Sequence, residues 1–575
     1  MRYTSENVKT IGLIVEDIFT DFSKETIHSV AHAVIDRKDI RLVVIAGRQD
    51  ESSDPNDKQH CYKVVYNSIL QIEEMCRFDG LILTFPNMKV EKDGRFEGIP
   101  KVYIASDRED ETTVNYDDEM GLREAIDYLV KIMGVTKLCM IGGRDDNADA
   151  IKRKKIFSEC LNEHGIYFGP ENYEKSDMSV RSEAAAIRLL DRNPGVQAIF
   201  CVNDQTAVGL YNVMAKRGLM PGKDILVFGF DNTHMSGDMI PPLASIGSDS
   251  SSLGQKALEL LLNKMAGKDV ENVTIPTRLY GRESCNYIMY DYDIREILDV
   301  DPKFIYRMFD DCFYRYRNEI IDKGAIDLKR LFYEFVSRMF ICMKNRYMSD
   351  AQFEEIEKLI NIFFKNRAMD FTDANKFIRS IERLQAAMNV VQKSVYVNVK
   401  NNRLLSKMRN YAIQAQFVSR NMATRAYNNG RNGIFDFQIE TSGTDLSYEG
   451  SIECIVDNLD KLGLRNAALY LFDEPVTYEE NTSKFPERIY LRSTIRNGEL
   501  YVLPPERQEC MIRDIFNREE LSSEGKGYTA FPLFFGNRVF GVLVCGMNRE
   551  MLDKGEYISA QLSRAIYMGH CAWKK

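Results

Sequence analysis

Two short polar segments of this sequence carry groups that could hold a small polar molecule. Asn203-Asp204 follows the apolar run 198–202, and Asp231-Asn232 follows the apolar run 225–230. In an open parallel sheet, ligands lie outside the carboxyl ends of the strands, so we expect these amides and carboxylates to be exposed there. Such groups accept and donate hydrogen bonds to vicinal hydroxyls, which is the chemistry that binds a sugar or another neutral polyol.

The sequence gives no comparable indication of catalysis. It contains no nucleophile elbow, no phosphate-binding loop and no metal-binding signature. The twelve cysteines are scattered without a CxxC pair, a pattern typical of reduced thiols in a cytoplasmic protein. We therefore predict a binding protein rather than an enzyme, with no catalytic residue, cofactor or metal.

The length and the net charge of the chain limit the classes of protein to which it could belong. A chain of 575 residues is too long for one domain, and its net charge of -9 provides no general attraction to nucleic acid or to anionic lipid. No apolar run approaches the roughly 20 residues that span a bilayer, and the polar start lacks a signal-peptide core. These features predict a cytoplasmic protein of several domains that does not bind a membrane.

The polar segments belong to a regular alternation of strands and helices. The expected strands are 11–15, 41–46, 80–85, 101–105, 137–143, 197–202 and 225–230, and the expected helices between them are 22–36, 60–76, 118–133, 149–164, 180–191 and 205–217. Continuous apolar strands alternating with helices indicate parallel sheet covered on both faces. So many units in about 230 residues predict two lobes with a cleft between them.

The motifs in this half resemble the effector-binding core of the lac-repressor/gal-repressor family. The matching segments are TIGLIVEDIFTDFS, FDGLIL, PKVYIASDR, VNYDDEMGLREAIDYLVKIMGVTKLCMIGG, the stretch 198–242 and the closing RESC. The resemblance implies a two-lobed periplasmic-binding-protein-like fold of the Venus flytrap type for residues 1–288. It also implies that ligand binds in the cleft between the lobes.

The same resemblance implies six ligand-binding positions. They are Phe22, Asp107, Arg153, Met178, Asn203 and Asp231. Three positions depart from the family: Ser23 and Met178 stand where aromatic residues are common, and Ile156 stands where glycine is usual. The loss of stacking aromatics favours a sugar over a nucleoside as the effector. The alternative for each of the six is a structural role, such as a strand-end cap or a hydrogen bond between lobes.

Repressors of this family begin with a DNA-reading helix-turn-helix of about 50 to 60 residues. Here the first expected strand already starts at Ile11, so we expect the sensor without that device. DNA is accordingly not expected as a partner.

Residues 289–430 have helical periodicity, with expected helix starts at Asp301-Pro302, Ser349 and Thr372-Asp373. A long helix from about 374 to 427 carries a coiled-coil-like seam that includes Leu404 and Met408 and ends at the Gly/Asn-rich break 428–433. Residues 383–435 contain nine basic residues and no acidic one. This helix either binds nucleic acid or an acidic partner, or lies against acidic neighbours such as 349–359; we favour the second interpretation.

The pattern of strands and helices in residues 431–575 predicts a small α+β domain that resembles a GAF-type sensor. Its expected strands are 467–472, 488–495, 528–535 and 538–547, with a hairpin turn at Gly536-Asn537. Helices are expected at 447–462, 507–515 and 554–570. The order of domains is similar to the input half of GGDEF-type signalling proteins, although no GGDEF text occurs here.

Together these patterns predict a homodimeric small-molecule sensor that relays ligand binding through the helices and the GAF-like domain to a downstream cyclase or regulator. The first alternative is a transcriptional regulator that binds DNA through the basic helix or through a partner. The second is a truncated or split diguanylate cyclase input module. The sequence does not name the ligand, the output or the sign of the response.

Overall fold

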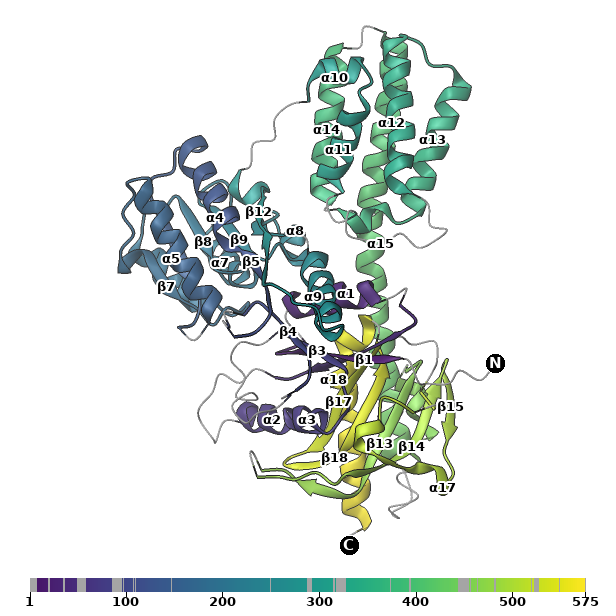
Figure 1. Cartoon of the computed structure of the whole chain (residues 1–575). Helices are drawn as coiled ribbons and strands as arrows, with labels where there is room; N and C mark the ends of the chain where they lie inside the picture. Colours follow the sequence, from purple (N-terminus) through teal and green to yellow (C-terminus); the bar gives the residue numbers. More distant parts are fainter. Residues whose placement is uncertain are drawn as a thin grey trace. The chain divides into compact units, whose positions relative to one another are not determined.

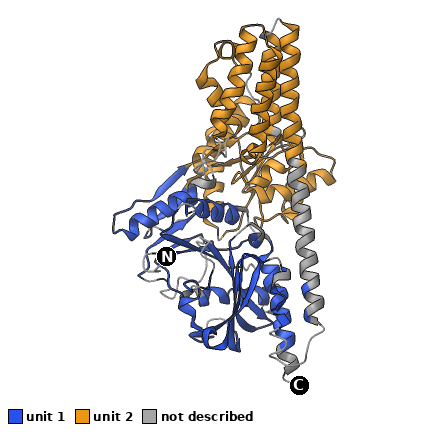
Figure 2. Cartoon of the chain, turned by 90° about the vertical axis from the view of Figure 1, so that its right-hand side faces the viewer, with its two compact units in different colours: residues 1–115, 253–275, 425–575 blue, residues 116–252, 276–424 orange. Residues whose placement is uncertain are grey.

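The computed structural model contains two compact units, which are described separately (Figure 2). Unit 1 comprises residues 1–115, 253–275 and 425–575, and unit 2 comprises residues 116–252 and 276–424. The structure describes residues 8–573 except 19–20, 35–36, 49–57, 85–95, 97, 107, 109, 146, 249, 287–291, 314–315, 317–326, 373, 392–393, 443–453, 456, 463, 480–481, 519, 522–526 and 548.

Unit 2 contains a six-stranded sheet with the order β12-β10-β9-β8-β6-β7. Its strands are β6 (Leu138–Gly142), β7 (Tyr173–Lys175), β8 (Ala198–Cys201), β9 (Leu226–Phe230), β10 (Ala244–Gly247) and the antiparallel β12 (Arg278–Tyr280). The helices are α4 (Asp118–Asp127), α5 (Ala148–Glu163), α6 (Glu183–Arg192), α7 (Asp204–Lys216) and α8 (His234–Asp238). The four central strands β6, β8, β9 and β10 are almost wholly buried, as expected when helices cover both faces of a parallel sheet.

Unit 1 begins with a second parallel sheet of the same kind. Its strands are β1 (Lys9–Val15), β2 (Ile40–Ala46), β3 (Gly80–Leu83), β4 (Lys101–Ile104), β5 (Thr113–Asp117) and β11 (Val273–Pro276). The helices are α1 (Asp21–Val34), α2 (Lys58–Tyr66), α3 (Ser68–Glu74) and α9 (Ser250–Met265). The alternation expected from the sequence is therefore confirmed in both halves of the region, with the element ends displaced by a few residues and the helix expected at 60–76 divided into α2 and α3.

This sheet continues into the C-terminal strands, so that the described strands of unit 1 form one sheet of twelve (Figure 1). The added strands are β13 (Ala467–Thr477), β14 (Arg488–Arg496), β15 (Glu499–Val502), β16 (Glu509–Met511), β17 (Gly527–Phe535) and β18 (Arg538–Gly546). The β17–β18 hairpin turns at Gly536-Asn537, as predicted. The closing helix is α18 (Arg549–Trp573), and α17 spans Pro505–Gln508.

The expected helix at 507–515 is wrong. Residues 509–511 form β16, which pairs with β14, and residues 512–514 form a single 3-10 turn. Apolar residues such as Ile512 and Ile515 are buried at helical spacing, but the pairing with β14 determines the backbone. Half of the residues of the other expected helix, 447–462, lie outside the described residues, and residues 459–462 form a 3-10 helix.

The remaining helices of unit 2 form an aromatic-rich bundle. They are α10 (Ile294–Leu298), α11 (Pro302–Cys312), α12 (Leu328–Lys344), α13 (Asp350–Lys365), α14 (Ala374–Val391) and the first part of α15 (Val395–Ser442). Two of the three expected caps are present: Asp301 precedes Pro302 at the start of α11, and Ser349 forms a capping box with Gln352 at the start of α13. The third, at Thr372-Asp373, falls in part outside the described residues.

The single helix expected from about 374 to 427 is wrong, because this region forms two helices, α14 and α15. Two further features of α15 differ from the expectation. Leu404 and Met408, expected in a coiled-coil seam, are buried in the bundle core. The Gly/Asn-rich stretch 428–433 does not interrupt the helix, because glycine and asparagine lower helix propensity by only about 1 kcal/mol per residue or less. The basic residues follow the favoured interpretation in the bundle, where Lys400 pairs with Asp350 at 2.7 Å and Lys407 with Glu357 at 2.8 Å.

No helix in the described part of the chain is both long and apolar enough to cross a membrane.

Candidate ligand-binding site

The site residues of unit 2 gather where its parallel strands end. β6, β8, β9 and β10 run in the same direction, with Ile141 opposite Cys201 and Phe200 opposite Phe228. The residues that follow these strands therefore share one edge of the sheet. Asn203 follows β8 and Asp231 follows β9 directly, so the sheet places them side by side, as the sequence predicted.

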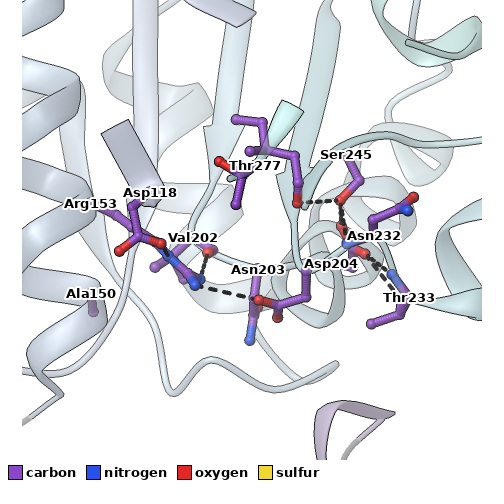
Figure 3. A network of polar contacts seen from close by, with 12 residues as sticks. Asp118, Ala150, Arg153, Val202, Asn203, Asp204, Asn232, Thr233, Ser245 and Thr277 are labelled. Carbon is purple, nitrogen blue, oxygen red and sulfur yellow. Dashed lines mark hydrogen bonds and ion pairs between the residues drawn. The ribbon is translucent and has the colours of Figure 1, made fainter. Parts of the chain in front are cut away.

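Arg153 of α5 lies at this edge beside Asp118 and Val202 (Figure 3). Its side chain is buried, and its guanidinium donates to the Val202 carbonyl at 2.9 Å, lies 3.3 Å from the Asp118 carboxylate and lies 3.4 Å from the Asp231 carboxylate. The guanidinium carbon also sits 3.6 Å from the centre of the Phe230 ring. Burial alone would lower the pKa of Arg153, but the charges of Asp118 and Asp231 raise it, so the cation persists at all ordinary pH values.

Asp231 is held in an unusual backbone conformation. Its φ is 95° and that of Asn232 is 50°, both in the left-handed region that non-glycine residues rarely adopt. The Asp231 N–H donates to the Ile246 carbonyl at 2.7 Å, which fixes the turn to β10. The carboxylate stays 17% exposed beside a guanidinium that is only 5% exposed. A strained turn that presents a carboxylate is typical of a binding position.

Asn203 and Met178 are joined to each other. The Asn203 side chain caps α7 by accepting from the Thr206 N–H at 2.9 Å, and its amide donates to the Met178 carbonyl at 3.0 Å. Met178 has a φ of 61°, and a side chain at Gly143 would come within 2.6 Å of its sulfur. Asn203 therefore has a structural role as a helix cap, and Met178 is positioned by that same amide.

The expectation that all four polar residues after β8 and β9 are exposed is wrong for two of them. Asp204 is 0% exposed and Asn232 is 6% exposed. Asp204 accepts from the Thr233 N–H at 2.8 Å and from the Ser245 hydroxyl at 2.6 Å, while Asn232 accepts from Arg282 at 2.7 Å. Burial and the charge of Asp231 raise the pKa of Asp204 to about 7. These two side chains connect β8, β9 and β10 instead of facing a ligand.

The structure thus brings four of the six predicted positions together: Arg153, Met178, Asn203 and Asp231. Phe22 is half-buried near the start of α1 in unit 1. Asp107 lies outside the described residues. The ligand-binding role of all six stays a prediction.

Sequence reasoning missed two residues that shape this edge. Asp118 is 2% exposed and pairs with both Arg153 and Lys152; Arg282 is 6% exposed and holds Asn232. Both stand in segments that match the family motifs, YDDEMG and GRES. The signal that would have found them is a charged residue at an otherwise buried position next to an oppositely charged one.

Comparison with known families agrees with this architecture. Residues 126–285 match a family model described as a periplasmic binding protein-like domain. The chain carries a periplasmic binding protein-like domain. Proteins of the lac-repressor/gal-repressor type are also similar to this chain. The family match ends at residue 285, so it does not test the resemblance of residues 431–575 to a GAF-type domain.

Two curated relatives are similar to this domain and its surroundings. The HTH-type transcriptional regulator CelR of Thermobifida fusca is 27% identical over 194 residues, which is 32% of this chain and 57% of CelR. The Lactose operon repressor of Escherichia coli (strain K12) is 27% identical over 232 residues, which is 39% of this chain and 62% of the repressor. The chain therefore spans about three fifths of the length of these relatives.

Among solved structures, the cellobiose complex of the transcriptional regulator CelR aligns with a TM-score of 0.41 at 22% identity. The alignment covers 48% of this chain and 85% of CelR.

Proposed function

We propose that this protein is a small-molecule sensor whose ligand binds to the periplasmic binding protein-like domain, at the carboxyl edge of the six-stranded sheet. The supporting observation is the Asp231 carboxylate, which a left-handed turn presents at the end of β9 and which the buried Arg153 holds at 3.4 Å. Phe22 and Asp107 remain the predicted contributors from the first lobe.

The charges at this edge favour a neutral polyol. Arg153 is already balanced by Asp118 and Asp231, and Lys152 lies 3.0 Å from Asp118. Since both cations face carboxylates, an anionic ligand would have to displace an existing ion pair, whereas a hydroxyl can donate to Asp231 without disturbing Arg153. The thioether of Met178, in place of an aromatic ring, supports a sugar over a stacked nucleobase.

The test is a thermal-shift screen of neutral sugars and nucleosides against the full-length protein, Asp231→Asn and Asp191→Asn. Asp191 is a matched control, because it is 62% exposed in the same unit and pairs with Arg217. We expect at least one sugar to raise the Tm of the wild type and of Asp191→Asn but not of Asp231→Asn. An equal shift in all three proteins would refute the assignment.

The proposed output is a relay through the helical bundle and the C-terminal strands within a cytoplasmic homodimer. Cytoplasmic placement is supported by the described cysteines, all of which are free thiols. A ligand changes the populations of two conformations by its differential affinity for them.

A transcriptional regulator is the second candidate, because the relatives are named as a transcriptional regulator and an operon repressor. These names weigh against the expectation that DNA is not a partner, and they favour regulation of transcription over a cyclase input module. Within the bundle, however, Lys400 and Lys407 already pair with Asp350 and Glu357. DNA binding by the full-length protein that weakens steeply with salt would support this candidate; no binding at low salt would remove it.

A further inference from the structure

Strand β17 extends the sheet of the first lobe along its β2 edge. β17 pairs in parallel with β2, with Gly527 opposite Leu42 and Ala530 opposite Ile45. β2 is therefore an interior strand, with β1 on one side and β17 on the other. An open strand edge offers unpaired N–H and C=O groups to any extended segment. The chain's own C-terminal residues occupy the position at which another chain would otherwise pair.

Aromatic side chains from both parts form one core next to this junction. The rings of Tyr62 and Tyr66, on α2, lie 5.1 and 6.3 Å from that of Phe534 on β17. The ring of Phe78 lies 6.2 Å from that of Phe516. Tyr66, Phe78, Phe516 and Phe534 belong to a single buried cluster that also includes core residues of β1, β2, β13 and β18, and the half-buried Tyr62 packs against it. A junction of this kind resembles a domain core more than a contact between separate domains.

A shielded ion-pair network crosses the same junction. Arg48, shortly after β2, lies 3.2 Å from Asp17 and 2.8 Å from Glu556 of α18. The Tyr62 hydroxyl donates to the Glu556 carboxylate at 2.9 Å. The side chains of Arg48, Asp17 and Glu556 are only 22, 16 and 9% exposed. Removing the guanidinium would leave two poorly solvated carboxylates close together without their cation, which is costly.

Asp17 lies between β1 and α1, and α1 carries the predicted ligand-binding residue Phe22. We propose that residues 527–573 permanently cover the β2 edge of this sheet. We further propose that Arg48 couples the docking of these residues to the conformation of the segment between β1 and α1. The coupling to ligand rests on the proposed function, because only that function makes Phe22 a binding residue. If it holds, ligand binding and docking of the C-terminal residues influence each other by equal amounts.

Hydrogen exchange measured by mass spectrometry tests this proposal on the full-length protein without any ligand. Arg48→Met is compared with the wild type and with Arg37→Met, which removes an exposed ion pair to Asp39 in the same unit. We expect amides of residues 527–535, 549–573 and 21–34 to exchange about tenfold faster or more in Arg48→Met. Residues 148–163 of unit 2 should be unchanged, and Arg37→Met should match the wild type.

Glu556→Gln provides a milder second variant, since glutamine keeps the shape and can still accept from Tyr62. It should accelerate exchange in the same three segments by a smaller factor. Wild-type exchange at 527–535 in both variants would overturn the proposed docking. Faster exchange there without any change at 21–34 would overturn the coupling. Because no ligand is present, a failure to find a sugar ligand would leave both results interpretable.

Discussion

The two sheets of the molecule begin alike and end differently. Each starts as parallel strands alternating with helices. The sheet of unit 2 closes with the short antiparallel strand β12, and its carboxyl edge carries the Arg153 cluster. The sheet of unit 1 instead continues sideways through β17 into the C-terminal strands. One architecture thus supports two uses, polar chemistry at the strand ends and pairing along the strand edge.

The largest predicted effect concerns the strand-end chemistry of unit 2. Replacing Arg153 by methionine leaves Asp118, which is 2% exposed, without its buried cation. We expect a loss of about 3 to 5 kcal/mol in unfolding free energy, measured by urea denaturation. A loss below 1 kcal/mol would show that the cluster is solvated and not a buried network.

A cavity in the core beside the β2–β17 pairing of unit 1 predicts a slightly smaller loss of unfolding free energy. Phe534→Ala removes the ring that packs on Tyr62 and Tyr66, at an expected cost of about 3 kcal/mol. Hydrogen exchange should accelerate in 40–46 and 527–535 together, because they share one core. Phe200→Ala, in the core of unit 2, should leave both segments unchanged. Faster exchange confined to 527–535 would show that the two parts do not form one body.

At the strand ends of unit 2, Asp204 is buried whereas Asp231 is partly exposed. The pH dependence of stability should reveal the burial of Asp204. Its folded pKa is about 7, above the ordinary value of 3.8, chiefly because burial disfavours the charge. The stability that this group contributes is therefore present below about pH 4 and is lost as pH rises through about 7. Between about pH 4 and 7, the unfolding free energy of the wild type should fall by on the order of 1 kcal/mol per pH unit because of Asp204. This decrease should be absent in Asp204→Asn. Asp191→Asn should retain it, and an unchanged slope in Asp204→Asn would contradict the assignment.

The smallest effect is expected in the bundle, away from both sheets. Lys407 and Glu357 are 29 and 34% exposed, so Lys407→Ala should cost about 0 to 1 kcal/mol. A larger cost in thermal denaturation at low salt would mean that this ion pair fixes α15 on α13.

The sequence was sufficient to predict the strands, the helices of both lobes and the strand-end position of Asn203 and Asp231, because continuous apolar runs and capping residues are local signals. It was insufficient for Asp204 and Asn232, whose burial depends on Arg282 and Ser245 from distant segments. The pairing of β17 with β2 could not be predicted from the sequence either. Both strands are apolar on both faces, and nothing in either run specifies a partner almost 500 residues away.

The most direct test of the central claim is isothermal titration calorimetry with the sugar that most stabilises the wild-type protein. Asp231→Asn keeps the shape of the side chain but removes the charge that accepts a ligand hydroxyl. We predict that Kd rises about tenfold or more in Asp231→Asn, with Asp191→Asn equal to the wild type. An unchanged Kd in Asp231→Asn would place the ligand elsewhere and contradict the account.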